Sequence, residues 1–180
     1  PVLNTPRLIL RQLLSSDAEA VFRIRGDYEV TKYNTGTAYT SIQEASELIA
    51  AIESSYQERS EIRWGITRKG HSEVIGMCGY NYWNRYDRRG SVGYDLARAY
   101  WGQGIMSEAV RAVVEFGFNH MELNRIEADA DARNPASARV LEKVGFQREG
   151  LQREQFYDSG SFCDLVLFGL LKRDYLKGSP

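Results

Sequence analysis

The change of hydrophobic period within residues 62–119 constrains the fold of this 180-residue chain more than any other feature. Ile62, Trp64 and Ile66 alternate with polar or small residues, which is typical of a half-buried strand. Polar turns at 69–72 and 84–89 then separate a return strand over 73–83 from a third strand over 90–96. Residues 104–119 carry apolar side chains at helical spacing. We therefore expect antiparallel hairpins whose sheet is covered by a long helix.

Two capping signals predict helices before these strands. Ser16 with Glu19, and Ser41 with Glu44, each match the capping box, in which a hydroxyl and a carboxylate bind free amides at a helix start. The apolar residues after Ser41 also recur at helical spacing. The predicted helices span 17–26 and 41–57, and alternating residues over 7–12 predict a short strand ahead of them.

The C-terminal part of the chain predicts a further strand, a helix and two last strands. Apolar and acidic residues alternate over 126–131. A helix is expected between Asn134, a favourable N-cap residue, and Gly145, a favourable C-cap residue. The last strands are expected near 146–156 and 162–171. The predicted fold class is α/β of the α+β type: one domain over 1–180, with a mixed, mostly antiparallel sheet of about seven strands and about four flanking helices.

Charge and cysteine content argue against several functional classes. Lys and Arg total 23 while Asp and Glu total 24, so the net charge of -1 provides no general attraction for nucleic acid or anionic lipid. Cys78 and Cys163 are too few for a disulfide framework and lack zinc-site spacing, so we expect buried thiols and no bound metal. Neither an apolar leader nor a membrane-spanning stretch is visible, and we expect a cytoplasmic protein.

Two glycines mark the loop before the long helix. Without Cβ atoms, Gly102 and Gly104 let the backbone curve so that several amides converge at the positive end of the helix. Such a junction suits a pyrophosphate group. A P-loop is excluded because no lysine and hydroxyl pair follows the second glycine. The dinucleotide fingerprint fits poorly, since Ser107 replaces its third glycine and hairpins join the preceding strands.

Several motifs resemble the GCN5-related N-acetyltransferases, the GNAT superfamily. They are Gly93-Tyr94-Asp95-Leu96, Tyr100-Trp101-Gly102-Gln103-Gly104-Ile105, and Asn134-Pro135-Ala136-Ser137 with Glu142-Lys143-Val144-Gly145-Phe146. The resemblance covers essentially the whole chain and is closest to the branch that acetylates the N-termini of ribosomal proteins. It implies direct acetyl transfer from acetyl-CoA to an amine, preferably a protein N-terminal α-amine, by an enzyme that could form a homodimer.

The resemblance also implies how acetyl-CoA would bind. Amides of the glycine loop would hold the pyrophosphate, and the pantetheine arm would pair with a strand as if it were another strand. The family's leading Arg or Gln falls on Ala99, although a loop built mainly from backbone does not require that side chain. The implied cofactor-binding residues are Tyr94, Asp95, Leu96, Gly102, Gln103, Gly104, Ile105, Met106, Ser107, Asn134 and Arg139.

Acetylation of an amine requires a base for the amine and a proton for the departing thiolate. An α-amine with a pKa of about 8 is roughly 10% neutral at pH 7, so a weak base acting through water suffices. The resemblance implies two nearly equal candidates for the base. Asp129 lies five residues before Asn134, where some related enzymes carry a glutamate base, and Glu154 lies in the region where the ribosomal-protein branch places its base. The resemblance implies that Ser137 is the acid, because the ribosomal-protein branch uses a serine at this helix start, beside the sulfur. Leu141 occupies the position of the tyrosine that serves as the acid in other related enzymes.

Other functions fit parts of the same pattern. A small-molecule acetyltransferase for a polyamine, amino acid or aminoglycoside would carry the same motifs. A CoA-binding module without catalysis and a dinucleotide-binding enzyme are further alternatives. The acidic residues over 127–131 are also explained by a solvated strand face, and the Ser137 hydroxyl by the needs of a helix start.

Overall fold

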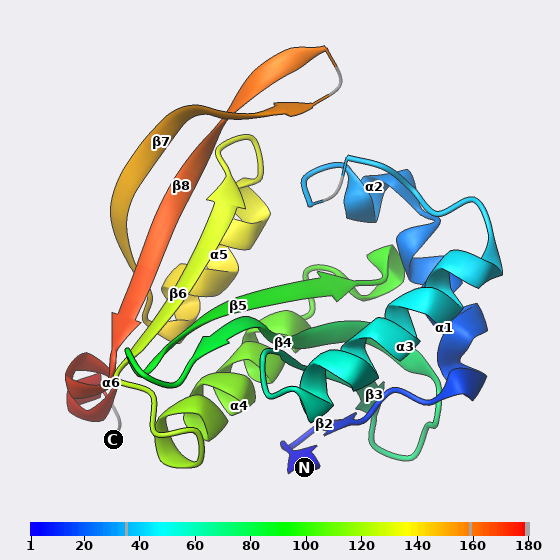
Figure 1. Ribbon diagram of the computed structural model, residues 1–180, viewed down its shortest axis with the longest axis horizontal. Helices are drawn as coiled ribbons and strands as arrows, with labels where there is room; N and C mark the ends of the chain where they lie inside the picture. Colours follow the sequence, from blue (N-terminus) through cyan, green and yellow to red (C-terminus); the bar gives the residue numbers. More distant parts are fainter. Residues whose placement is uncertain (35, 159, 179–180) are drawn as a thin grey trace.

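Eight strands form one continuous sheet in the computed structural model, which describes residues 1–34, 36–158 and 160–178 (Figure 1). Their order is β1-β2-β3-β4-β5-β6-β8-β7, and every neighbouring pair is antiparallel except β5 and β6. The strands are β1 (Leu3–Asn4), β2 (Leu8–Arg11), β3 (Ile62–Arg68), β4 (Val74–Asn84), β5 (Arg89–Leu96), β6 (Arg125–Asp131), β7 (Gln147–Asp158) and β8 (Ser161–Leu171). The predicted sheet is confirmed, with the two-residue β1 as an addition.

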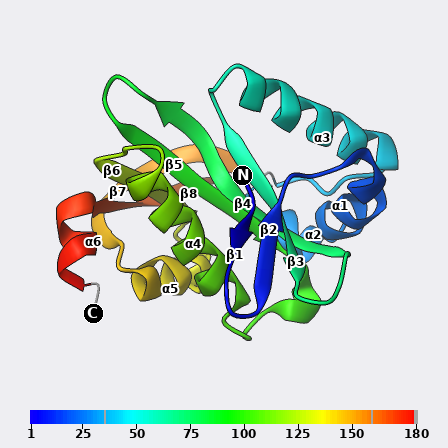
Figure 2. The same ribbon diagram turned by 90° about the horizontal axis from the view of Figure 1, so that it is seen from below.

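Helices cover both faces of this sheet (Figure 2). They are α1 (Ala18–Arg25), α2 (Tyr28–Thr31), α3 (Ile42–Gln57), α4 (Ile105–Asn119), α5 (Pro135–Val144) and α6 (Lys172–Gly178), with 3-10 turns at Ser15–Asp17 and Arg98–Tyr100. One hydrophobic core joins the sheet to α4 and α5 and includes Trp64, Tyr80 and Phe118, while α1 and α3 pack on the other face around Val21 and Ile49. The sequence predicts α1, α3, α4 and α5, whereas α2 and α6 are additions. No helix within the described residues is long and apolar enough to cross a membrane.

The two predicted capping boxes have different outcomes. Glu44 accepts hydrogen bonds from the amide and hydroxyl of Ser41, so the box at the start of α3 is confirmed. The box between Ser16 and Glu19 is wrong, because α1 begins at Ala18 without a side-chain cap. The Asp17 carboxylate instead accepts from the amide before the 3-10 turn and pairs with the last arginine of β2.

Strands β5 and β6 separate soon after they begin. They are paired only over Arg89–Ser91 and Arg125–Glu127, and beyond these residues the strands diverge (Figure 1). Residues 92–96 are therefore paired with β4 on one side and with no strand on the other, as far as the described chain extends. This split in the sheet brings the start of α5 opposite the last residues of β5.

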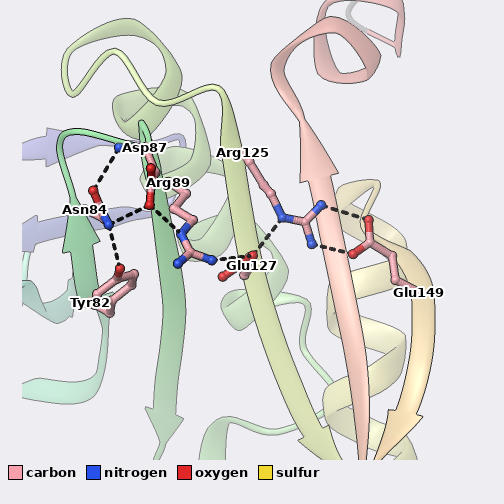
Figure 3. A network of polar contacts seen from close by, with 7 residues as sticks. All are labelled: Tyr82, Asn84, Asp87, Arg89, Arg125, Glu127 and Glu149. Carbon is pink, nitrogen blue, oxygen red and sulfur yellow. Dashed lines mark hydrogen bonds and ion pairs between the residues drawn. The ribbon is translucent and has the colours of Figure 1, made fainter.

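Ion pairs link the strands at the closed end of the split (Figure 3). Arg125 of β6 donates to Glu149 of β7 and, at 2.8 Å, to Glu127 Oε1. Arg89 of β5 lies 3.7 Å from the same Glu127 oxygen and 3.6 Å from Asp87. Charged side chains thus support the short region where β5 and β6 still pair.

Candidate active site

The loop before α4 has the open backbone that its glycines predict. Gly102 and Gly104 have φ values of 73° and 72°, in the left-handed region that favours glycine. A Cβ atom at Gly102 would meet nothing within 4 Å, so backbone conformation rather than packing requires this glycine. Gly104 is the N-cap residue of α4 and provides no side-chain cap, and the amides of 102–107 donate to no acceptor in the described chain. The loop therefore presents several free donors at the positive end of a helix.

Side chains of the N-terminal arm hold this loop in place. The Arg7 guanidinium donates to the Gln103 carbonyl at 3.0 Å and pairs with Glu108 at 2.6 Å. Glu108 also accepts from the Thr5 hydroxyl at 2.6 Å. Burial alone would raise the pKa of Glu108, but the hydrogen bonds from Thr5 and Arg7 outweigh it and lower that pKa. Arg7 thus places a cation beside the glycine loop. The family motif has an Arg or Gln at the position that Ala99 occupies in this chain.

Tyr94 and Ser137 meet across the split. The Tyr94 hydroxyl lies 2.9 Å from Ser137 Oγ and donates to the Ser137 carbonyl at 3.2 Å. On the other side, the Asn134 side chain accepts from the Ser137 amide at 3.2 Å and caps α5. Burial raises the pKa of Tyr94, although the hydrogen bond with Ser137 works in the opposite direction. The predicted acid is therefore held between a helix cap and a half-buried phenol.

Asp129 is the carboxylate of the acidic strand that has no hydrogen-bond or ion-pair partner among the described residues. Glu127 is paired with Arg125, and Asp131 is paired with Arg133 at 2.5 Å. Although solvent reaches Asp129, desolvation by the surrounding protein raises the pKa of its carboxyl. Its negative charge adds to the rise in the pKa of Tyr94, which places Asp129 within electrostatic range of the Tyr94 hydroxyl.

Glu154 lies in a bulge of β7, where residues 153–155 stand out from the pairing with β8. Its φ is 51°, its side chain is exposed, and its amide donates to Asp164 Oδ1 at 2.8 Å. Arg153, Glu154 and Asp164 line a polar cavity of about 600 Å³. No contact in the described part of the chain joins this cavity to Ser137. Neither candidate base contacts Ser137 within the described residues, and Asp129 is the one whose charge acts on the Tyr94 hydroxyl.

The other predicted cofactor residues differ in what their side chains do. The Asp95 side chain is 2% exposed and pairs with Arg25 of α1 at 2.6 Å, so only its backbone is free to pair with a ligand. The Gln103 side chain donates to the Ala99 carbonyl at 2.9 Å and supports the loop. Leu96, Ile105, Met106 and Ser107 are buried, whereas Arg139 is exposed on α5.

Both cysteines are buried free thiols, as predicted. Burial raises the pKa of the Cys78 thiol to about 12, which leaves it protonated and a poor nucleophile at neutral pH. Leu141 is completely buried in the core beside α4, so this position contributes packing and no polar group.

Sequence reasoning missed the long-range contacts of two arginines. Arg7 acts through tertiary contacts with a loop far along the chain, and no local pattern indicates them. Arg133 pairs with Asp131 and Asp158 and lies 5.7 Å from the centre of the Tyr33 ring. An acid and a base two residues apart at the end of a strand could have suggested the first of these pairs.

Comparison with known proteins places this geometry in a family. Residues 7–147 match the family profile described as Acetyltransferase (GNAT) domain. An uncharacterized N-acetyltransferase p20 of Bacillus licheniformis is 39% identical, over 96% of this chain and 97% of the relative. A putative ribosomal N-acetyltransferase of Bacillus subtilis, YdaF, is 32% identical over 67% of this chain and 64% of its own.

Solved structures share the fold. RimL, a ribosomal L7/L12 alpha-N-protein acetyltransferase in complex with coenzyme A, has a TM-score of 0.87 at 19% identity, over 95% of this chain and 98% of RimL. Spermidine N-acetyltransferase from Vibrio cholerae, in complex with CoA and spermine, has a TM-score of 0.84 at 22% identity, over 96% and 99% of the two chains. The chain belongs to the GNAT acetyltransferase family and is an acetyl-CoA-dependent N-acetyltransferase.

Proposed function

We propose that the chain acetylates the N-terminal α-amine of a protein, with a ribosomal protein as the acceptor. The observation that carries this proposal is the placement of Ser137, which is held at the start of α5 by Asn134 and Tyr94 and lies opposite β5. The resemblance to the ribosomal-protein branch implies a serine acid at this helix start. The name of the Bacillus subtilis relative supports the same acceptor class.

The free amides of 102–107 bind the pyrophosphate of acetyl-CoA, and the helix start adds favourable charge. Gly102 and Gly104 permit close approach, and Arg7 provides a nearby cation. Acetyl-CoA supplies the acetyl group as a thioester. Residues 94–96 offer the unpaired strand edge for its pantetheine arm.

Asp129 is the base in this proposal. It is unpaired and lies within electrostatic range of Tyr94, whereas Glu154 lies in the β7 bulge. A carboxylate is adequate for an α-amine, which has an appreciable neutral fraction at pH 7. A lysine amine with a pKa of about 10.4 would instead require roughly 4.6 kcal/mol for deprotonation. The local chemistry therefore suits an N-terminus better than a lysine side chain.

The transfer step breaks one bond and forms another. The neutral amine nitrogen bonds to the thioester carbonyl carbon, and the carbon–sulfur bond breaks with its electron pair left on sulfur. The amine proton passes to Asp129 and on to solvent. The Ser137 hydroxyl gives a proton to the sulfur and is restored from solvent. The products are the acetylated amine and the free thiol.

Thiol release from acetyl-CoA tests the acceptor class. Peptides that begin with Ser or Ala are compared with the same peptides blocked at the α-amine, and with spermidine, amino acids and an aminoglycoside. We expect turnover with free N-termini and none with blocked ones. Activity confined to small amines would contradict the proposal and favour the second candidate, a polyamine acetyltransferase, whose acceptor would suit the carboxylates of Glu154 and Asp164.

Two substitutions by neutral isosteres distinguish the two candidate bases. Asp129→Asn is expected to lower kcat about 100-fold, which is the size of a lost general base. Glu154→Gln is expected to lower it at most about threefold, because an exposed side chain in the bulge contributes little. The reverse order of effects would move the base to Glu154.

A further inference from the structure

We propose that Tyr94 is a positioning residue whose hydroxyl donates to Ser137 and thereby directs the Ser137 proton toward the sulfur of the departing coenzyme. This inference rests on the proposed function, in which Ser137 is the acid. The family resemblance implies only that the Tyr94 backbone pairs with the pantetheine arm. It implies no role for the Tyr94 hydroxyl.

The contacts of Ser137 allow its Oγ to accept from the Tyr94 hydroxyl. Tyr94 OH lies within 3.2 Å of both Ser137 oxygens, and its single proton can be shared between them. The Ser137 amide is already occupied by Asn134. With Oγ accepting from Tyr94, the Ser137 O–H is free to donate into the split. Ser137 is half-buried, so solvent and ligand still reach it.

The protonation of Tyr94 suits a permanent donor. Burial raises the pKa of the phenol, so Tyr94 keeps its proton throughout the neutral range. A phenolate would instead accept the Ser137 proton and withdraw it from the sulfur. The negative charge of Asp129 also disfavours the Tyr94 phenolate. The proposed base thus helps to keep the proton on the residue that orients Ser137.

Tyr80 provides a matched control inside the same molecule. It lies on β4, it is completely buried, and its hydroxyl donates to the Val113 carbonyl of α4 at 3.0 Å. Burial raises the pKa of Tyr80 as well. The two tyrosines therefore share a hydroxyl that is bound to a helix and a pKa that burial raises. They differ in exposure, since Tyr94 is half-buried and Tyr80 completely buried, and in whether the hydroxyl meets Ser137.

A double-mutant cycle tests whether Tyr94 acts through Ser137. We expect Tyr94→Phe to lower kcat about tenfold and Ser137→Ala about 100-fold, which are the effects of losing one hydrogen bond to the serine and one to developing charge. The double variant is expected to equal Ser137→Ala, and Ser137→Thr, which keeps a hydroxyl, is expected to restore most of the activity. Equal kcat for Tyr94→Phe and Tyr80→Phe, or losses that multiply in the double variant, would overturn the proposal.

The thiol of bound CoA gives a readout that does not depend on turnover. Its pKa is followed by the ultraviolet absorbance of the thiolate, and a donor that faces the sulfur lowers it. We expect Tyr94→Phe and Ser137→Ala each to raise the thiol pKa by about 1, with no change in Tyr80→Phe. In the opposite arrangement Ser137 donates to Tyr94, and Tyr94→Phe would then leave the thiol pKa unchanged or lower it, which would overturn the proposal.

These measurements separate failure of this inference from failure of the proposed function. Wild-type protein that binds CoA but acetylates no N-terminus would refute the acceptor class, while the thiol pKa would still decide the role of Tyr94. If Tyr94→Phe does not fold, fluorotyrosine at position 94 keeps the ring and strengthens the donor. The proposal then expects a lower thiol pKa than in the wild type, and an unchanged value would overturn it.

Discussion

Helices α4 and α5 both begin beside the split in the sheet, but only α5 has a side-chain cap on its first turn. The N-cap residue of α4 is Gly104, which lies in the left-handed region and provides no side-chain cap. The N-cap residue of α5 is Asn134, whose side chain accepts from the Ser137 amide at 3.2 Å, and Pro135 is the first helical residue. The first turn of α4 leaves its amides free, whereas in α5 Asn134 binds one amide and Pro135 has no amide hydrogen.

One kind of helix terminus can thus perform two tasks. Free amides with a partial positive charge can bind an anion that the protein does not itself supply. A capped and proline-restrained turn holds its side chains in one geometry, which suits a group that must point at a reacting atom. The uncapped start is thus prepared for a ligand, and the capped start for Ser137.

The largest expected effect comes from adding a side-chain cap to the free amides at the start of α4. Gly104→Asp would place a carboxylate where it can accept from the α4 amides and repel the pyrophosphate. We expect acetyl-CoA to bind about 100-fold more weakly, since charge-assisted hydrogen bonds to the anion are lost. Calorimetry with acetyl-CoA measures this change.

Gly70→Asp is the matched control for that substitution. Gly70 has a φ of 81° in the turn between β3 and β4, and nothing lies within 4 Å of its Cβ position. The backbone strain is therefore similar, and we expect unchanged acetyl-CoA affinity. Equal affinity in the two variants would show that the α4 start does not bind the cofactor.

A smaller effect is expected from removing the side-chain cap of α5. Asn134→Ala removes the cap of α5 and should cost about 1 kcal/mol of unfolding free energy. We also expect kcat to fall about tenfold, because Ser137 loses one of its two supports. Ser41→Ala, which removes the cap of the remote helix α3, should cost similar stability with unchanged kcat. Loss of stability in Asn134→Ala without loss of kcat would contradict the role given to this cap.

The smallest expected effect concerns the stability cost of Asp129, the unpaired carboxylate of β6. The folded-state pKa of Asp129 is raised, so folding disfavours the ionised form. This destabilisation is present above the folded pKa and vanishes below the unfolded one. Asp129→Asn should therefore raise the Tm at neutral pH by less than about 3 °C, because solvent exposure reduces the effect. The gain should fade as the pH falls through the carboxyl range, and a gain that persists at low pH would exclude this origin.

Local chemistry explains why much of the fold was predictable. The glycine loop followed by α4, and the helix between Asn134 and Gly145, are set by residues adjacent in sequence. The prediction failed where a tertiary partner competes for a local signal, as at Asp17, which pairs with an arginine of β2. Helix α2 has four residues and therefore no hydrophobic period.

The candidate site was predictable in its backbone and less so in its side chains. The open conformation of Gly102 follows from its lack of a side chain, and the capping role of Asn134 follows from its place before Pro135. The hydroxyl of Tyr94 could not be assigned from sequence, because its partner lies 43 residues away and is reached only across the split. The same applies to Arg7 beside the glycine loop.

The most direct test of the account follows the backbone amides of 102–107 by NMR while CoA is added. Hydrogen bonds to the pyrophosphate should move these amide proton resonances strongly downfield. Pantetheine, which lacks the pyrophosphate, should leave them nearly unchanged while perturbing residues 94–96. CoA that binds without moving the 102–107 amides would contradict the claim that the uncapped start of α4 holds the cofactor.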